Sequence, residues 1–308
     1  MGIVWKLAEA AGEREDVYRF RYEQYFAGMG DLPGTDHGAR RVWLPHDDCS
    51  WHFAARSSHE KIIAVGTATP AAEPSLYQEW REMFELSRLG KLVPQLILIS
   101  RVVVAKEARN SALFGSLCLY LARTFMAKGY HYAAHYCAPG MVPMYERLGY
   151  RLYGRGKALH GGEYRLPMLY LADDRPYLCR VRSPFRSLAE EKEGAFWCAK
   201  AMQVCPELSN SPLCAMPREA REQCLTSLYP PLSAQPELLR RLARGSILAL
   251  KAGDVLAPEG KAEGAFYVLS GILECGGRIF PGTIMQTGRE RAAALENTLV
   301  ITGSFDKE

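Results

Sequence analysis

The run LILISRVVVA, from Leu96 to Ala105, restricts the possible folds more than any other stretch of the sequence. It is nearly continuous in apolar residues and rich in β-branched ones, which is typical of a strand covered on both faces of a sheet. It is too short to span a membrane, and Arg101 interrupts it. A strand of this kind needs helices on either side, so the chain is expected to have an α/β fold.

The segments around this strand alternate between helical and extended patterns up to about residue 185. Val17 to Phe26 has helical periodicity, and a long helical pattern runs from Ser111 to Gly129, a residue suited to a helix C-terminus. WHFAAR, KIIAVGTAT, YHYAAHYCA and YRLPMLYL read as strands. The sequence therefore predicts an α/β domain over residues 1–185, with a mixed sheet flanked by helices.

Two further segments have different patterns. Residues 186–243 contain helical stretches separated by Pro, Ser and Asn, and are predicted to form a helical connector. Residues 244–308 read as short strands between glycine turns, which indicates a small β-roll.

Composition narrows the function classes. The 308 residues carry a formal net charge of +4, which is too mild to indicate nucleic-acid binding. No window has the apolar length of a membrane span and the N-terminus lacks the apolar core of a secretory leader, so we expect a cytoplasmic protein. The nine cysteines form no C-x-x-C pair, so we expect reduced thiols and no metal site.

The turn between the long strand and the long helix is a candidate anion site. EARNSALFG is short and polar and carries Arg109. Because helix N-termini offer free N–H groups and a positive dipole end, a phosphate is the ligand that such a turn usually receives.

Strand, arginine-containing turn, helix, strand and the motif YERLGY together resemble the GCN5-related acyltransferase superfamily. In that family the turn holds the pyrophosphate of coenzyme A or the phosphopantetheine of a carrier protein. The resemblance implies a donor site formed by Arg109, Asn110, Ser111, Ala112, Leu113 and Gly115. The usual pattern has an earlier glycine, and its absence here favours acyl carrier protein over coenzyme A. The resemblance also implies that Tyr145 protonates the leaving thiolate.

A narrower resemblance links residues 16–185 to the branch of acyl-homoserine-lactone synthases and long-chain N-acyl amino acid synthases. FRYEQYF, HDDCSWHFAAR, AVGTA, LISRVVV and VRSPF carry it. It implies an acceptor site formed by Arg21, Asp48, Ser100 and Arg101. This chain departs from the branch in two places, because Leu98 stands where a glutamate is frequent and Thr69 where an arginine is usual.

Transfer from a thioester to an amine needs a polarised carbonyl, a base and an acid. Backbone N–H groups from Val102 to Val104 are the candidates for the carbonyl oxygen, with Val103 assigned to catalysis and Val102 and Val104 to donor binding. His135 is the candidate base, because a histidine is easily poised near neutral pH. The alternatives are that His131 and His135 merely pack in the sheet, or that they bind zinc with Cys137, although a flat strand spreads such ligands.

Arg101 lies on a strand predicted to be buried, so it requires an acidic or anionic partner. One interpretation is an internal salt bridge with Asp48 or Asp36. The other is binding of a substrate carboxylate.

The C-terminal stretch SILALKAGDVLAPEG, followed by AFYVLSG, resembles the first half of a cyclic nucleotide-binding domain. Pro281-Gly282-Thr283 and Arg289 or Arg291 stand where the phosphate cassette is expected, and the glutamate that holds the ribose is missing. We expect a degenerate roll that serves packing or homodimer contacts. The alternative is a nucleotide sensor that controls the first domain.

From these residues we predict an N-acyltransferase that moves a long-chain acyl group from acyl carrier protein to an amine, expected to be an amino acid. No permanently bound cofactor is expected, since the phosphopantetheine thioester or an acyl-coenzyme A is a substrate. The expected partners are the carrier protein and a small amine. The alternatives are an acetyl-coenzyme A-dependent enzyme acting on a protein lysine or small amine, and an inactive acyltransferase fold that serves as a regulatory module.

Overall fold

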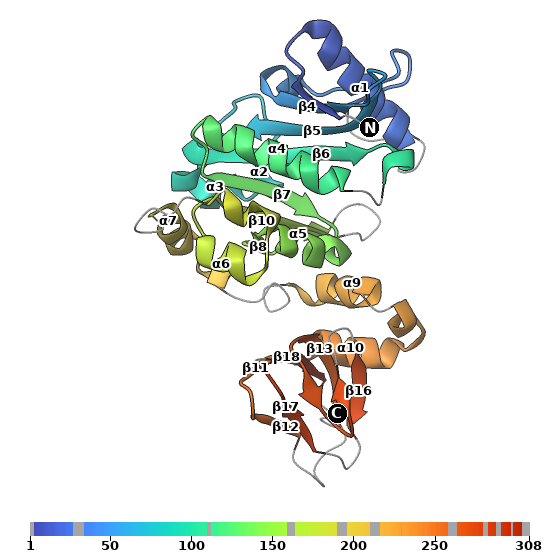
Figure 1. Ribbon diagram of the computed structural model, residues 1–308, viewed down its shortest axis with the longest axis vertical. Helices are drawn as coiled ribbons and strands as arrows, with labels where there is room; N and C mark the ends of the chain where they lie inside the picture. The colour runs from blue at the N-terminus through green and yellow to red at the C-terminus, as the bar shows by residue number, and fades with distance from the viewer. Residues whose placement is uncertain are drawn as a thin grey trace. The chain divides into compact units, whose positions relative to one another are not determined.

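The computed structural model describes residues 3–26, 34–109, 112–158, 164–189, 196–209, 216–228, 230–257, 264–279, 283–287, 291–296 and 298–303 (Figure 1). The chain divides into two compact units. The first comprises Met1–Cys137, Met144–Lys157 and Arg165–Ser209, and the second comprises Ala138–Pro143, Ala158–Tyr164 and Asn210–Glu308.

The first unit is built on one twisted sheet. Its strands, in spatial order, are β1 (Val4–Leu7), β4 (Trp51–Arg56), β5 (Ile62–Pro70), β6 (Leu96–Val104), β7 (Tyr132–Cys137), β10 (Tyr164–Leu171) and β8 (Tyr150–Leu152), with β9 (Lys157–Ala158) pairing to β10. Neighbours along this path are antiparallel, except that β6 and β7 are parallel. The predicted mixed α/β sheet is therefore confirmed. A short hairpin, β2 (Thr35–Asp36) and β3 (Arg41–Val42), stands apart from it.

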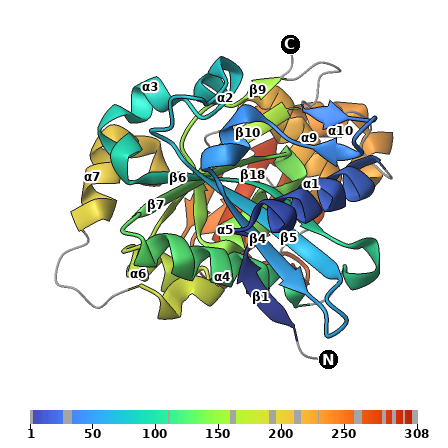
Figure 2. The same ribbon diagram turned by 90° about the horizontal axis from the view of Figure 1, so that it is seen from above.

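Helices cover both faces of this sheet (Figure 2). On one face lie α1 (Ala11–Phe26), α2 (Gln78–Met83), α3 (Leu86–Leu89) and α7 (Phe196–Val204). On the other face lie α4 (Leu113–Ala127), α5 (Val142–Leu148) and α6 (Arg175–Arg180). Two neighbouring residues of β5 show the division, because Gly66 faces Leu121 of α4 while Thr67 accepts a hydrogen bond from Arg21 of α1. We call these the α4 face and the α1 face.

Short 3₁₀ turns connect many of these elements. They are η1 (Pro45–Cys49), η2 (Gly90–Gln95), η3 (Lys106–Ala108), η4 (Pro139–Met141), η5 (Pro184–Ser187), η6 (Pro206–Ser209) and η7 (Pro230–Ala234).

The second unit contains two four-stranded antiparallel sheets. One has the order β11 (Ser246–Leu250), β18 (Thr298–Gly303), β13 (Gly264–Ser270), β16 (Ile284–Thr287), and the other β12 (Val255–Ala257), β17 (Ala292–Ala294), β14 (Leu273–Glu274), β15 (Arg278–Ile279). They share a small apolar core that includes Phe266, Leu273 and Val300. The predicted small C-terminal β-roll is present.

The helices expected in a connector are divided between the units. α7 lies in the first unit, whereas α9 (Arg218–Leu228) and α10 (Pro236–Arg244) lie in the second. Of the candidate phosphate cassette, Pro281, Gly282 and Arg289 lie outside the described residues, and Arg291 is exposed. The resemblance to a nucleotide-binding domain stays a prediction.

Gly149 joins α5 to β8 and offers a test of this packing. Its φ is +105°, and a Cβ added there would lie 2.3 Å from Cδ2 of Leu178. Gly149→Ala is therefore expected to lower the free energy of unfolding by about 1–3 kcal/mol. Gly12 in α1 has open space where a Cβ would lie, with no neighbouring atom within 4 Å, so Gly12→Ala is expected to stabilise by roughly 0.5–1 kcal/mol. Chemical denaturation of both variants checks this, and equal effects would contradict it.

Candidate active site

The centre of the sheet opens where β6 and β7 part. The two strands pair only from Leu96 to Leu98 on β6 and from Tyr132 to Ala134 on β7. Beyond these pairs, β6 continues to Val104 and β7 to Cys137. Backbone groups facing this opening are available to a ligand, because buried N–H and C=O groups otherwise need partners.

A β-bulge on β6 lies beside the opening. Thr67 pairs with Ser100 and Val65 with Val103, so Gly66 alone on β5 is opposed by two residues, Arg101 and Val102. Arg101 has a φ of +49°, which is uncommon for a residue with a side chain. The extra residue interrupts the alternation of the strand. As a result the Arg101 side chain joins the α1 face.

The same bulge decides which amides face the opening. The N–H of Ala105 donates to the carbonyl of Ile63 at 2.8 Å, so alternation directs the Val103 N–H toward β5 as well. Val102 and Val104 then direct theirs to the side from which β7 has diverged. Among the three valines considered from the sequence, Val102 and Val104 have the suitable orientation.

On the α4 face, His135 and Tyr145 lie together at the opening. His135 is the first residue of β7 beyond the paired segment. Its ring centroid is 3.7 Å from that of Tyr145 on α5 and 4.7 Å from that of Tyr150 on β8. Two side chains predicted from separate motifs are thus brought into contact.

Burial determines the protonation of this pair. It lowers the pKa of His135 to about 3, so the imidazole is neutral at physiological pH. Its Nε2 has no hydrogen-bond partner among the described residues. Burial also raises the pKa of the Tyr145 phenol, which therefore keeps its proton. A proton donor and a neutral nitrogen consequently lie side by side.

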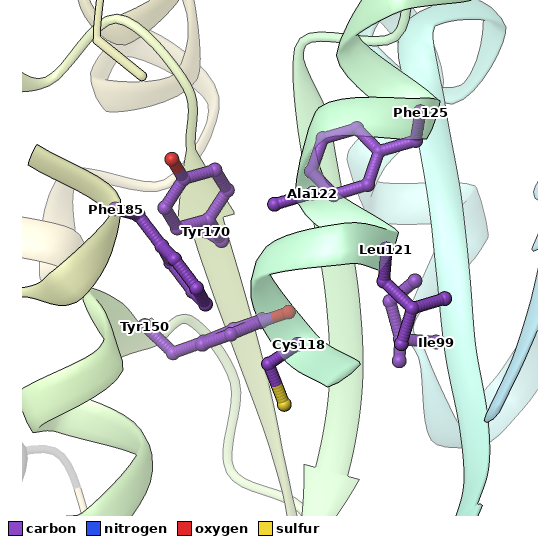
Figure 3. A pocket seen from close by; sticks show the side chains of 8 residues that line it. All are labelled: Ile99, Cys118, Leu121, Ala122, Phe125, Tyr150, Tyr170 and Phe185. Carbon is purple, nitrogen blue, oxygen red and sulfur yellow. The ribbon is translucent and has the colours of Figure 1, made fainter. Parts of the chain in front are cut away.

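A small apolar cavity adjoins this pair on the α4 face. Its volume of about 20 Å³ is enough for one water-sized group. Figure 3 shows its lining: Ile99, Cys118, Leu121, Ala122, Phe125, Tyr150, Tyr170 and Phe185. Tyr150 connects the two features, because it lines the cavity and also contacts His135.

The α1 face holds a buried ionic cluster. Arg21 of α1 is fully buried and donates to Oδ1 of Asp47 at 3.1 Å and to Nδ1 of His52 at 3.0 Å. It also donates to Oγ1 of Thr67. The Nε2 of His52 lies 2.8 Å from the Asp47 carbonyl, so His52 is a neutral tautomer with its proton on Nε2. Burial, followed by Arg21, lowers the pKa of His52 to about 4.

Asp47 joins Arg21 to Arg101. Its Oδ2 accepts from a terminal nitrogen of Arg101 at 2.6 Å and from the N–H of Leu44 at 2.8 Å. Burial alone would raise the pKa of Asp47, but the two guanidinium groups outweigh it and lower this pKa to about 2. Two positive charges and one negative charge therefore leave the cluster with one net positive charge. The Arg101 side chain, 9% exposed, is the part of the cluster closest to solvent.

His46 borders this cluster and has a buried ring whose two nitrogens lack partners among the described residues. The ring lies 4.4 Å from Trp80, and the Arg101 guanidinium lies 5.8 Å from the same indole. Burial lowers the pKa of His46 to about 4, so it is neutral. An acceptor bound at Arg101 would find a free imidazole nearby.

The predicted acceptor residues are distributed unequally. Arg21, Ser100 and Arg101 are on the α1 face, and Ser100 Oγ is buried without a partner among the described residues. Asp48 is exposed and accepts from Trp43 Nε1 at 3.3 Å. The salt bridge to Arg101 is made by Asp47, rather than by Asp48 or Asp36. Sequence reasoning missed Asp47, His46 and His52, although all three lie in or beside the quoted HDDCSWHFAAR stretch.

The predicted donor turn follows β6. The Nε of Arg109 donates to the carbonyl of Val104 at 3.3 Å, and Leu113 begins α4. Ala112 is exposed, and nothing lies within 4 Å of a Cβ added at Gly115. Asn110 and Ser111 lie outside the described residues. The turn therefore reaches from the opening to the N-terminus of a long helix.

Two further findings concern function classes. His131 stacks on Trp197 of α7 at 4.0 Å, whereas His135 contacts Tyr145, and the described residues contain no group of three ligands placed to hold a metal ion. Within the same part of the chain, every helix is too short or too polar to cross a membrane.

Comparison with known proteins gives similarity at the level of structure. No family model and no curated protein sequence matches the chain. BjaI, a CoA-dependent acyl-homoserine lactone synthase solved with SAM and isopentyl-CoA, is 15% identical over 66% of this chain and 99% of its own, with a TM-score of 0.48. FeeM, an N-acyl amino acid synthase from uncultured soil microbes, is 12% identical over 59% and 96%, with a TM-score of 0.47. The acyl-homoserine lactone synthase LasI is 15% identical over 57% and 94%, with a TM-score of 0.45.

Proposed function

We propose that this chain is an N-acyltransferase that moves an acyl group from a thioester to an amine that carries a carboxylate. One observation supports this most directly. The opening between β6 and β7 has the Tyr145–His135 pair on one face of the sheet and a cluster of net positive charge on the other. The same opening can therefore receive two substrates of different chemistry.

The donor belongs on the α4 face in this proposal. A thioester bound along β6 places its carbonyl oxygen near the N–H groups of Val102 and Val104, which stabilise an oxyanion. Its acyl chain is apolar, and the cavity next to Tyr150 is the apolar space available. The phosphate-bearing part of the donor extends toward Arg109 and the N-terminus of α4. Chains longer than the cavity require the side chains lining it to move.

The reaction then proceeds by ordinary acyl transfer. The neutral amine nitrogen attacks the carbonyl carbon, and the carbonyl π electrons move to oxygen to give a tetrahedral oxyanion. The carbon–sulfur bond then breaks, giving an amide and a thiolate. The amine loses one proton to His135 or to water, and the thiolate gains one from Tyr145. One proton is thus transferred overall from nitrogen to sulfur, and His135 is a candidate base because its imidazole is neutral.

The acceptor belongs on the α1 face. A carboxylate that approaches Arg101 meets a guanidinium with N–H donors beyond the one bonded to Asp47. It also balances the one net positive charge of the cluster, which reduces the cost of burying that charge. This supports an amino acid or another carboxylated amine as acceptor.

Arg101→Gln is expected to raise the KM for a carboxylated amine by about tenfold or more, because it removes a charge-assisted hydrogen bond worth roughly 1.5–3 kcal/mol. The KM for the corresponding amine without a carboxylate should change little. Steady-state kinetics with the two acceptors and one acyl donor measure this. Loss of both activities to the same extent would remove Arg101 from acceptor recognition.

The activity itself is tested with purified protein, acyl-carrier protein or acyl-coenzyme A, and a mixture of amino acids. Mass spectrometry of the lipid extract should show N-acylated amino acids. The same products should accumulate in cells that express the chain. No acylated amine with either donor would refute the proposed function.

A further inference from the structure

The surface formed by the end of α5, α6 and η5 is strongly basic. Arg147 lies in the last turn of α5 and Arg180 ends α6, while Arg182 and Arg186 belong to the turn that follows. All four are exposed. Residues 175–189 contain no Asp or Glu. We call these four residues the arginine surface.

Local packing brings the arginine surface together. Ser183 Oγ donates to the carbonyl of Leu148 at 2.7 Å, which fixes the turn after α6 against the end of α5. The guanidinium of Arg186 donates to the carbonyls of Arg182 and Ser183 at 3.4 and 3.1 Å. Segments separated by about one helix and one strand in the sequence therefore contribute to one surface.

Internal counter-charges are few at this surface. Among the described residues, no carboxylate forms an ion pair with any of the four guanidinium groups. Glu146 lies near Arg180 and Arg147, and burial raises its pKa to about 6 despite them. Arg151, which lies 3.7 Å from the Tyr177 ring, is already paired with Asp174. Four positive charges against the single carboxylate of Glu146 leave a net charge of +3.

A purely structural role explains only part of this arrangement. Arg147 and Arg180 are in the last turns of helices, where cations interact favourably with the helix dipole. Arg182 and Arg186 lie outside α5 and α6, so the dipole gives no reason for their charge. Their exposure indicates a partner outside the chain.

Resting on the proposed function, we infer that the arginine surface docks an acidic carrier protein that brings the acyl thioester. Arg147 is two residues from Tyr145 on the same helix, a rise of about 3 Å. A carrier on this surface therefore stands next to the side chain that meets its thiolate. Charge complementarity of this kind accelerates encounter and selects the partner.

Other polyanions fit this surface less well. Proteins that bind membrane surfaces insert large apolar side chains next to their basic ones. Single-stranded nucleic acids need exposed aromatic rings for stacking. Among the described residues, none of the exposed large apolar or aromatic side chains belongs to α5, α6 or η5.

The test is a calorimetric titration with a bacterial type II acyl carrier protein that carries its phosphopantetheine. Arg182→Glu/Arg186→Glu is expected to weaken binding at low salt by about tenfold or more, with a smaller difference in high salt. Lys61→Glu/Lys91→Glu makes the same change of charge at two exposed positions on other elements and should leave binding nearly unchanged. Arg182→Lys/Arg186→Lys keeps the charge and should retain most of the affinity.

Kinetics separate docking from chemistry. The charge-reversed variant should show a raised KM for the acyl-carrier donor and an unchanged KM for the small donor acyl-pantetheine. Equal affinity of wild type and charge-reversed variant, or no carrier binding by the wild type, would overturn the docking proposal. Loss of binding to anionic vesicles or DNA without loss of carrier binding would overturn it too, and would assign the surface to those partners. No acyl transfer from either donor would refute the proposed function, while the titration would still decide the docking surface.

Discussion

Asp47→Ala is expected to lower the free energy of unfolding by about 3–5 kcal/mol, the largest stability effect of any single change considered. The substitution removes the carboxylate that lies between Arg21 and Arg101, both of which donate to it. Two guanidinium groups would then share a buried site without a counter-charge. Chemical denaturation of wild type and variant measures the difference.

Asp48→Ala is the matched control, because it is the neighbouring residue of the same type. Asp48 is exposed and its carboxylate bonds Trp43 Nε1, so its loss should change the unfolding free energy by less than about 0.5 kcal/mol. A larger effect at Asp48 than at Asp47 would show that the buried cluster is wrongly identified.

The pH dependence of the Asp47 effect has a definite sign. The pKa of Asp47 is lowered in the folded chain to about 2, compared with about 3.9 for an unfolded aspartate. Its contribution is therefore complete above about pH 4 and is lost as the pH falls toward 2. The difference in stability between wild type and Asp47→Ala should shrink over that range. A difference that stays constant would mean that the carboxylate is not the source of the effect.

Tyr145→Phe is expected to reduce kcat for acyl transfer by about 10²–10⁴-fold, the range of general acid catalysis. Burial keeps the phenol protonated and places it against His135, so the variant loses a donor without losing the ring. The KM for the donor should stay nearly constant, because no binding contact is removed. Steady-state and single-turnover kinetics distinguish the two constants.

Tyr170→Phe provides the control for that measurement. The Tyr170 hydroxyl is buried and has no hydrogen-bond partner among the described residues, so its removal should leave the rate unchanged. Unaltered turnover in Tyr145→Phe, or an equal loss in both variants, would exclude Tyr145 as the acid.

Much of the first unit was accessible from local sequence patterns. The apolar run of β6, the long α4 ending before Gly129 and the alternation of β7 each have a period or a terminal signal. The motif YERLGY identified Tyr145, and strand alternation placed His135 on a face of β7. The sequence could not show that these two side chains touch, because that contact depends on how α5 packs against the sheet.

The ionic cluster was harder to predict for a physical reason. Asp47 and Asp48 are adjacent and chemically identical, and only the 3₁₀ turn η1 decides which one points inward. His52 gives no local sign that its ring accepts from an arginine on α1. The bulge at Arg101 is equally hidden, since nothing in LISRVVV marks an extra residue. Long-range contacts select these arrangements, and a local pattern does not contain them.

The bulge also bears on the order in which substrates bind. Because one extra residue on β6 turns Arg101 to the α1 face while Val102 stays on the α4 face, acceptor and donor reach the same strand from opposite sides. Neither substrate then has to leave before the other arrives. Under the proposed function, the acyl group passes directly between them within a ternary complex, and no acylated form of the protein is needed as an intermediate.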